Sequence, residues 1–193
     1  MSEDLKLGGD AAVTLTSSET DLAQGATYPL PVENTGTWCT SENATCDNQS
    51  LMRKTGAPNG YLYNWYAATA GTGVYGTGAN QNASASICPK GWKLPTKDQY
   101  VALDVAYGGN GSDRTGDTTQ VNKFLASPLN FNYTGYVGGG SVLSPSGVAY
   151  YWSRTANSEA YAYNLLFQPN GRFSPQYSNR KHLGFAVRCV AAS

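Results

Sequence analysis

The sequence contains little charge. Its 193 residues include 13 Lys and Arg, 13 Asp and Glu and a single histidine, which gives a net charge of zero at pH 7. Charged residues make up 13% of the chain, about half the usual share in a globular protein. A protein that follows nucleic acid needs clustered Lys and Arg to neutralise the phosphates. We therefore expect no nucleic-acid partner.

Long apolar segments are missing as well. No run of about 18 apolar residues occurs, so we expect no transmembrane segment in this chain. Residues 1–24 lack the basic start and the apolar centre of a signal peptide. An export or anchor segment trimmed from before Met1 is compatible with this start.

Tyrosine and glycine are abundant instead. The chain has 14 Tyr, 4 Trp, 5 Phe and 22 Gly, with runs of Asn, Ser and Thr. At recognition surfaces Tyr supplies rigid contact area, while Ser, Gly and Asn supply adaptable hydrogen bonds. The composition therefore indicates a protein that binds a partner through its surface.

The four cysteines indicate disulfides. An even number of cysteines in a chain of this composition favours two bridges and an oxidising compartment, so we expect a cell-surface or secreted protein. Three pairings are open. Pairing Cys39 with Cys46 closes a short local loop and leaves Cys88 with Cys189, which would stabilise the fold by about 4 to 5 kcal/mol. A zinc site is the competing interpretation, but no CxxC pair occurs and His182 is the only histidine.

The length fits one domain with an N-terminal extension. Residues 1–35 are polar and include two prolines near their end, so we expect an extended arm with one strand near residues 12–15. Residues 36–193 then form the domain.

Two helices are predicted in the middle of the domain. Thr96 and Gln99 have the spacing of a capping box, which places a helix from residue 97 to the glycines at 108–109. A second helix is expected over residues 118–126, before Pro128.

Short strands account for most of the remaining pattern. They are expected over residues 60–66, 149–154, 160–167, 172–174 and 184–190. Two helices followed by a C-terminal set of short antiparallel strands is an α+β arrangement.

Catalytic and metal-binding patterns are weak. No serine nucleophile elbow accompanies His182, and no phosphate-binding Gly loop occurs, so we expect neither an enzyme nor a cofactor. The loop at residues 109–117 contains Asp113 and Asp117, whose oxygens suit calcium. Its spacing differs from that of an EF-hand, however, and a solvated turn is the preferred interpretation.

The region from Tyr150 to Arg188 separates into two kinds of position. Leu165, Phe167 and Phe173 would share one apolar strand face, and the alternate residues would point to solvent. This region has five basic residues against one acidic residue, an excess of four. Such a surface favours an anionic or carbonyl-rich partner.

Four segments resemble a known family. They are Tyr63-Asn64-Trp65, the run from Ile87 to Thr96, Tyr151-Trp152-Ser153 and the run from Gly184 to Cys189. Together they resemble the Fibrobacter succinogenes major paralogous domain family over about residues 60–190. The resemblance implies a C-type lectin-like fold, which is similar to that of formylglycine-generating enzymes.

Within that family the C-terminal half resembles the variable region, about residues 150–189, of a protein diversified by a diversity-generating retroelement. The resemblance implies a fixed frame and a set of diversified, ligand-contacting residues. The frame would comprise Trp152, Ser153, Ala162, Leu165, Phe167, Phe173, Pro175, Arg180, Gly184, Phe185, Val187, Arg188 and Cys189. The ligand-contacting set would comprise Asn157, Glu159, Tyr161, Tyr163, Asn164, Leu166, Gln168, Arg172, Ser174, Gln176, Tyr177, Ser178, Asn179, Lys181 and His182.

The leading interpretation is therefore a bacterial surface protein that presents residues 157–182 to a protein or other macromolecular ligand. Two alternatives stay open. One is an enzyme of the formylglycine-generating type, which would need free thiols at Cys88 and Cys189. The other is a structural subunit of a filament or envelope, with contacts made by the arm.

Overall fold

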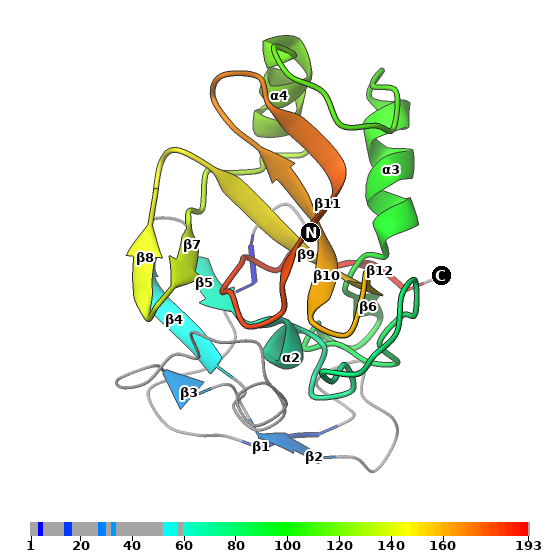
Figure 1. Cartoon of the computed structure of the whole chain (residues 1–193), viewed down its shortest axis with the longest axis vertical. Helices are drawn as coiled ribbons and strands as arrows, with labels where there is room; N and C mark the ends of the chain where they lie inside the picture. The colour runs from blue at the N-terminus through cyan, green and yellow to red at the C-terminus, as the bar shows by residue number, and fades with distance from the viewer. Residues whose placement is uncertain are drawn as a thin grey trace.

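The computed structural model describes residues 4–5, 14–16, 27–29, 32–33, 52–57 and 60–192. Figure 1 shows the arrangement of the helices and strands in this part of the chain. In chain order they are β1 (Thr14–Thr16), β2 (Thr27–Pro29), β3 (Val32–Glu33), β4 (Met52–Ala57), β5 (Gly60–Tyr63), α2 (Trp65–Ala68), β6 (Trp92–Lys93), α3 (Lys97–Ala106), α4 (Thr118–Leu125), β7 (Tyr136–Gly138), β8 (Ser141–Leu143), β9 (Ala149–Ala156), β10 (Tyr161–Phe167), β11 (Phe173–Arg180) and β12 (Val190–Ala191).

A three-stranded antiparallel sheet forms the centre of the domain. Its strand order is β11–β10–β9, so β10 lies between its two neighbours in sequence. In Figure 1 the sheet runs through the middle of the molecule, with α3 to its right and α4 near the turn that joins β10 to β11. The other described strands form a second three-stranded sheet, β3–β4–β5, and three two-stranded sheets.

Apolar side chains cover both faces of the central sheet. On one face Leu165, Phe167 and Phe173 are completely buried in a cluster with residues of α3 and α4. Phe124 of α4 packs edge-to-face on Phe173, with the ring centroids 4.8 Å apart. Trp152 of β9 belongs to a second cluster on the opposite face. The sheet is therefore held from both sides, and the predicted inward orientation of the three apolar strand residues is confirmed.

The two predicted helices are confirmed. The Thr96 hydroxyl accepts a hydrogen bond from the Gln99 amide at 3.2 Å, and the Gln99 side chain accepts one from the Thr96 amide at 2.9 Å. At the start of α4 the Asp117 carboxylate accepts a hydrogen bond from the Gln120 amide at 3.0 Å. Each contact satisfies an amide that the first helical turn leaves without a partner.

The predicted strand over residues 60–66 is right only as far as Tyr63. Beyond it, Trp65–Ala68 form the single turn of α2. The Asn64 side chain accepts a hydrogen bond from the Ala67 amide at 2.9 Å. Asparagine is among the best residues for this N-cap position, so the local helix start prevails over the aromatic alternation that suggested a longer strand.

The C-terminal strands differ from the prediction in their limits. β9 and β10 correspond to the expected strands, but β11 continues to Arg180, well past the expected end at residue 174. Residues 184–186 form isolated bridges to β5, β7 and β9, and β12 begins only at Val190. The hairpin of β7 and β8 was not predicted. The α+β class, with few helices and short antiparallel strands, is confirmed.

A disulfide joins Cys88 to Cys189 across 101 residues of sequence. This bridge confirms one of the predicted pairings and ties the middle of the chain to its C-terminal end. Cys39 and Cys46, the other predicted pair, lie outside the described residues.

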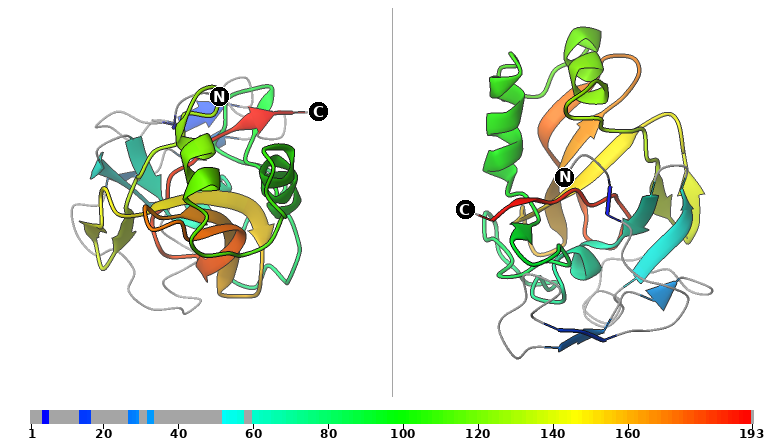
Figure 2. Two further views of the ribbon diagram at one scale, coloured as in Figure 1. Left: turned by 90° about the horizontal axis from the view of Figure 1, so that it is seen from above. Right: turned by 180° about the vertical axis from the view of Figure 1, so that it is seen from behind.

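Residues 4 and 5 pack into the domain. The Leu5 amide donates to the Val187 carbonyl at 2.8 Å, and the Asp4 carboxylate accepts hydrogen bonds from Arg188 Nε at 3.0 Å and Nη2 at 2.5 Å. Figure 2 shows this short N-terminal piece beside the C-terminal segment when the molecule is seen from behind. This part of the predicted arm is therefore buried. Among the described residues, no helix has the length and apolar character required to cross a bilayer.

Candidate functional site

Most of the predicted ligand residues are accessible on or next to the hairpin formed by β10 and β11. They occupy both sides of it, because Tyr163 pairs with Ser178 while Tyr177 pairs with the buried Asn164. Ten of the fifteen are exposed or half-buried. They are Asn157, Glu159, Tyr161, Tyr163, Gln168, Arg172, Gln176, Tyr177, Ser178 and Asn179. We call these ten residues the hairpin face.

The other five predicted ligand residues are buried, so the expectation that they face solvent is wrong. Asn164, Leu166 and Lys181 have no exposed surface, while Ser174 is 2% and His182 is 5% exposed. Within the predicted frame, Arg180 is exposed.

Irregular pairing explains the errors within β10. The register shifts between Asn164 and Leu166 on the β11 side, and between Ala162 and Asn164 on the β9 side. A shift of this kind breaks the strict alternation of side chains across a strand. Residues 164–167 are therefore buried in succession, which a period of two does not predict.

Lys181 acts as an internal link between loops. Its ammonium group donates to the carbonyl oxygens of Glu159, Val74 and Thr77 at 2.7, 3.1 and 3.2 Å. It also lies 4.6 Å from the centroid of the Trp65 ring, within reach of a cation–π contact. Because these groups come from separate segments, Lys181 holds the loop after α2 against the turn before β10.

His182 lies next to this link. Burial lowers the pKa of its imidazole below the ordinary value of 6.5, and the charge of Arg180 lowers it further. Both causes disfavour the imidazolium form, so the folded protein holds this side chain neutral at pH 7.

Three tyrosines of the hairpin face each have a basic side chain beside the ring. The Arg172 guanidinium lies 4.9 Å from the centroid of Tyr177, and the Lys97 ammonium lies 5.1 Å from that of Tyr163. Arg180 Nε donates to the Tyr161 hydroxyl at 3.2 Å. These contacts restrict the rings while leaving part of each accessible, and rigid aromatic area is what a binding surface requires.

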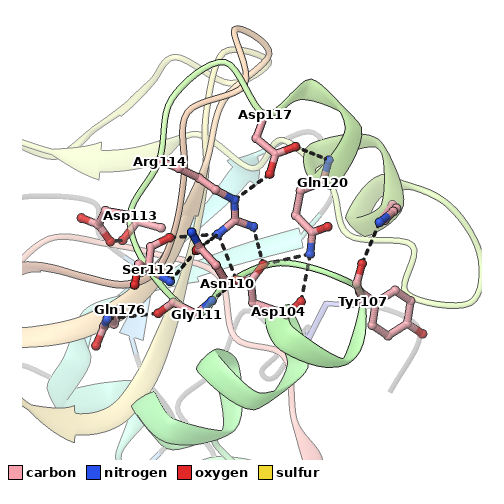
Figure 3. Close-up of polar contacts among 12 residues, drawn as sticks. Asp104, Tyr107, Asn110, Gly111, Ser112, Asp113, Arg114, Asp117, Gln120 and Gln176 are labelled. Carbon is pink, nitrogen blue, oxygen red and sulfur yellow. Dashed lines mark hydrogen bonds and ion pairs between the residues drawn. The ribbon is translucent and has the colours of Figure 1, made fainter.

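A buried ionic network fixes the loop that follows α3. Asp104 of α3 accepts hydrogen bonds from Arg114 Nη2 at 2.5 Å, Gln120 Nε2 at 2.8 Å and the Gly111 amide at 2.9 Å. Arg114 Nε donates to Asp117 at 2.6 Å. Figure 3 shows how these side chains converge from α3, the loop and α4. The Arg114 hydrogen bond is the main reason why the pKa of Asp117 is lowered from 3.8.

The same loop runs along the outer edge of β11. The Asp117 amide donates to the Gly171 carbonyl at 3.0 Å, and Arg114 and Phe173 exchange two backbone hydrogen bonds at 2.9 Å. A side chain at position 171 would meet the backbone of residues 116–118 at less than 3 Å, so only glycine fits this approach. The loop is thus attached to the hairpin at several points, unlike the solvated turn that the sequence suggested.

The carboxylates of this loop are poorly placed to bind calcium. The Asp117 carboxylate is already engaged by Arg114 and by the first turn of α4, and Asp113 accepts a hydrogen bond from the Ser174 hydroxyl. In the part of the chain that the structure describes, no three His, Cys, Asp or Glu side chains come together in a way that suits a metal ion.

Two basic residues that contributed to the predicted positive excess are internal. Arg188 is 4% exposed and paired with Asp4, while Lys181 is surrounded by carbonyl oxygens. The basic side chains that remain at least partly accessible in this region are Arg154, Arg172 and Arg180, against the exposed Glu159. The surface is therefore more evenly charged than the sequence indicates.

Family comparison identifies the chain. The model of the Fibrobacter succinogenes major domain matches residues 16–191, which is most of the sequence. The chain belongs to this family. No curated protein and no solved structure matches it. The family match begins in β1, within the predicted arm.

One cavity of this Fibrobacter succinogenes major domain is lined by none of the predicted ligand residues. It has a volume of about 450 Å³ and lies between α3, residues 128–131 and residues 188–190. Its main polar groups have partners inside the protein: Tyr100 donates to the Trp152 carbonyl, and Arg188 is paired with Asp4. The phenol and the guanidinium that line this cavity are therefore already engaged inside the protein, whereas a usual small-molecule site has polar groups placed to orient its ligand.

The adjacent residues Arg180 and Lys181 give a matched test of the family domain. We expect Lys181→Met to lower the free energy of unfolding by about 2 to 4 kcal/mol, because the completely buried ammonium group and its hydrogen bonds to three carbonyl groups are lost. Arg180→Met, on the exposed side, should change it by less than about 1 kcal/mol. Urea unfolding of both variants measures the difference. Equal effects would contradict an internal role for Lys181.

His182 allows a direct test of the local electrostatics, since it is the only histidine. Its pKa, measured by NMR titration of the ring protons, should lie below 6.5. Arg180→Gln should raise it, and Arg154→Gln should leave it unchanged. Because the folded pKa is the lower one, the neutral ring favours folding above pH 6.5, and this contribution falls as the pH drops toward the folded pKa. A pKa at or above 6.5 would contradict the burial.

Proposed function

We propose that this chain is a ligand-binding protein of the bacterial cell surface, or a secreted one, with a C-type lectin-like fold. The hairpin face is its binding surface, and the ligand is a protein or another macromolecule. The observation that supports this most is the position of Tyr161, Tyr163 and Tyr177, which remain half-buried on the hairpin while Ala162 and Asn164, the alternate residues of β10, are completely buried.

The energetics of such a face suit recognition. A tyrosine that becomes buried in a partner's pocket contributes about 2 kcal/mol or more, and the surrounding polar side chains add selectivity. Little entropy is lost on binding when the rings are already restricted by neighbouring cations and by the sheet. The hairpin face therefore needs no rearrangement to bind a partner.

We further propose that the hairpin face is diversified by a retroelement. Support comes from the division between exposed and buried positions, because every residue of the predicted frame except Arg180 is buried. Substitutions on the accessible side of a strand usually change stability by about 0.5 kcal/mol or less. A frame of this kind tolerates many different faces.

The enzyme alternative is disfavoured. Cys88 and Cys189 are joined and buried, so neither provides the free thiol that an oxidase of the formylglycine-generating type requires. The filament alternative depends on the arm, most of which lies outside the described residues. We therefore retain the binding protein as the main proposal.

The binding face is tested by replacing Tyr161, Tyr163, Arg172 and Tyr177 together by alanine. The melting temperature should fall by less than about 5 °C, because none of the four is fully buried. Binding to an array of immobilised bacterial surface proteins and cell-envelope glycans should be lost. A control with Val105→Ala and Leu143→Ala, two exposed apolar residues elsewhere, should bind as the parent does. Binding by the quadruple variant would overturn the proposal.

The diversification is tested in the neighbouring DNA. We expect a reverse transcriptase gene and a second copy of the codons for residues 150–190 that differs at adenines of the template. The changed codons should belong to the ten residues of the hairpin face. Changes concentrated in buried codons such as those of Leu165 and Phe167, or a locus without either element, would reject this part of the proposal.

A further inference from the structure

A small cavity separates the loop after α3 from the start of β11. It has a volume of about 320 Å³. Its walls come from the loop on one side and from the hairpin on the other, and they comprise Asp113, Arg114, Thr115, Arg172, Phe173 and Ser174. The cavity thus adjoins the hairpin face at Arg172 and extends it toward residues that lie outside the predicted variable region.

The walls of the cavity are fixed before any ligand arrives. Arg114 is held by Asp104 and Asp117, and its backbone pairs with that of Phe173. Its guanidinium also lies 4.6 Å from the centroid of the Phe173 ring. The Gln176 side chain donates to the Gly111 carbonyl at 3.2 Å, which attaches the loop at a further point.

Asp113 is the acidic group that remains accessible in this cavity. One of its oxygens accepts a hydrogen bond from the Ser174 hydroxyl, and this contact orients the carboxylate. The residue is exposed, and among the described side chains no Lys or Arg forms an ion pair with it. Ser174 is itself only 2% exposed, so its main part is to position Asp113.

Among the charges around the cavity, that of Asp113 favours a cation. Arg114 is engaged by two carboxylates, Asp104 and Asp117, and the charge of Lys123 also acts on Asp117, so the charges of this network balance one another. The two charged side chains of the cavity that this network leaves over are Asp113 and Arg172. Arg172 is in addition held over the Tyr177 ring. Attraction between a bound cation and Asp113 is strong at short range in a partly enclosed site.

We propose that this cavity is a subsite of the binding surface that receives a basic side chain of the ligand, whose ammonium or guanidinium group pairs with Asp113. The subsite deepens the proposed function and depends on it for the nature of the ligand. It makes the loop from Asn110 to Thr115 a constant wall beside the variable hairpin face.

The test uses the full chain labelled with ¹⁵N and the probe N-acetyl-arginine amide. The probe should shift the amide signals of residues 112–115 and 172–174. Asp113→Asn should weaken its binding by about tenfold or more, as expected for the loss of a charged hydrogen bond. Asp98→Asn is the matched control, since that carboxylate lies on α3 with a side chain 87% exposed, and it should leave the binding unchanged.

Two further measurements separate a subsite from nonspecific attraction. Arg172→Ala should strengthen probe binding, because a like charge is removed, and N-acetyl-glutamate amide should shift none of these signals. Stronger binding of the glutamate probe, or unchanged arginine binding in Asp113→Asn with an unaltered melting temperature, would overturn the subsite. Neither result bears on array binding through the tyrosines, so failure of the subsite is distinguishable from failure of the proposed function.

Discussion

The fold depends on two adjacent aromatic residues of β9 that point to opposite faces of the central sheet. Tyr151 packs in the cluster under α3 and α4, and its hydroxyl donates to the Asp4 carboxylate at 3.0 Å. Trp152 packs in the other cluster, 4.2 Å from the Phe185 ring, and its indole donates to the Tyr63 carbonyl at 2.8 Å. Both are completely buried. Because β9 is fixed on both faces, β10 and β11 are added to a strand that cannot tilt, and their accessible side chains keep a defined geometry.

Buried charge has a structural role in this domain. Asp104 with Arg114, and Asp4 with Arg188, are pairs in which the carboxylate has no exposed surface. Breaking such a pair is costly because the remaining charge stays in a poorly solvated site. Each pair joins two different segments: the first fixes the loop beside β11 to α3, and the second fixes the N-terminal residues to the C-terminal segment. Although the chain contains few charged residues, several of them form ion pairs in the interior of the domain.

The parts of the structure that depend on neighbouring residues could be predicted from the sequence. The capping box of Thr96 and Gln99 located α3, and the spacing of Leu165, Phe167 and Phe173 located the buried face of the hairpin. The burial of Asn164 and Leu166 could not be predicted, because it results from register shifts that depend on β9 and β11. The burial of Lys181 could not be predicted for a similar reason. Its carbonyl partners are 22 to 107 residues away in sequence, and a backbone carbonyl leaves no mark in a residue pattern.

The burial of five predicted ligand residues reduces the part of the surface that can vary without affecting the fold. Lys181 supports two loops and Ser174 orients Asp113, so substitutions at either position change the framework as well as the face. Diversification at such positions lowers the fraction of variants that fold, because a lost partner for a buried polar group costs about 1 to 3 kcal/mol of a total stability of only 5 to 15. Variation confined to the hairpin face avoids this cost. Under the proposed function, a constant loop at its edge would give every variant one recognition element of unchanged charge, while the tyrosines and polar side chains of the hairpin would determine which partner is bound.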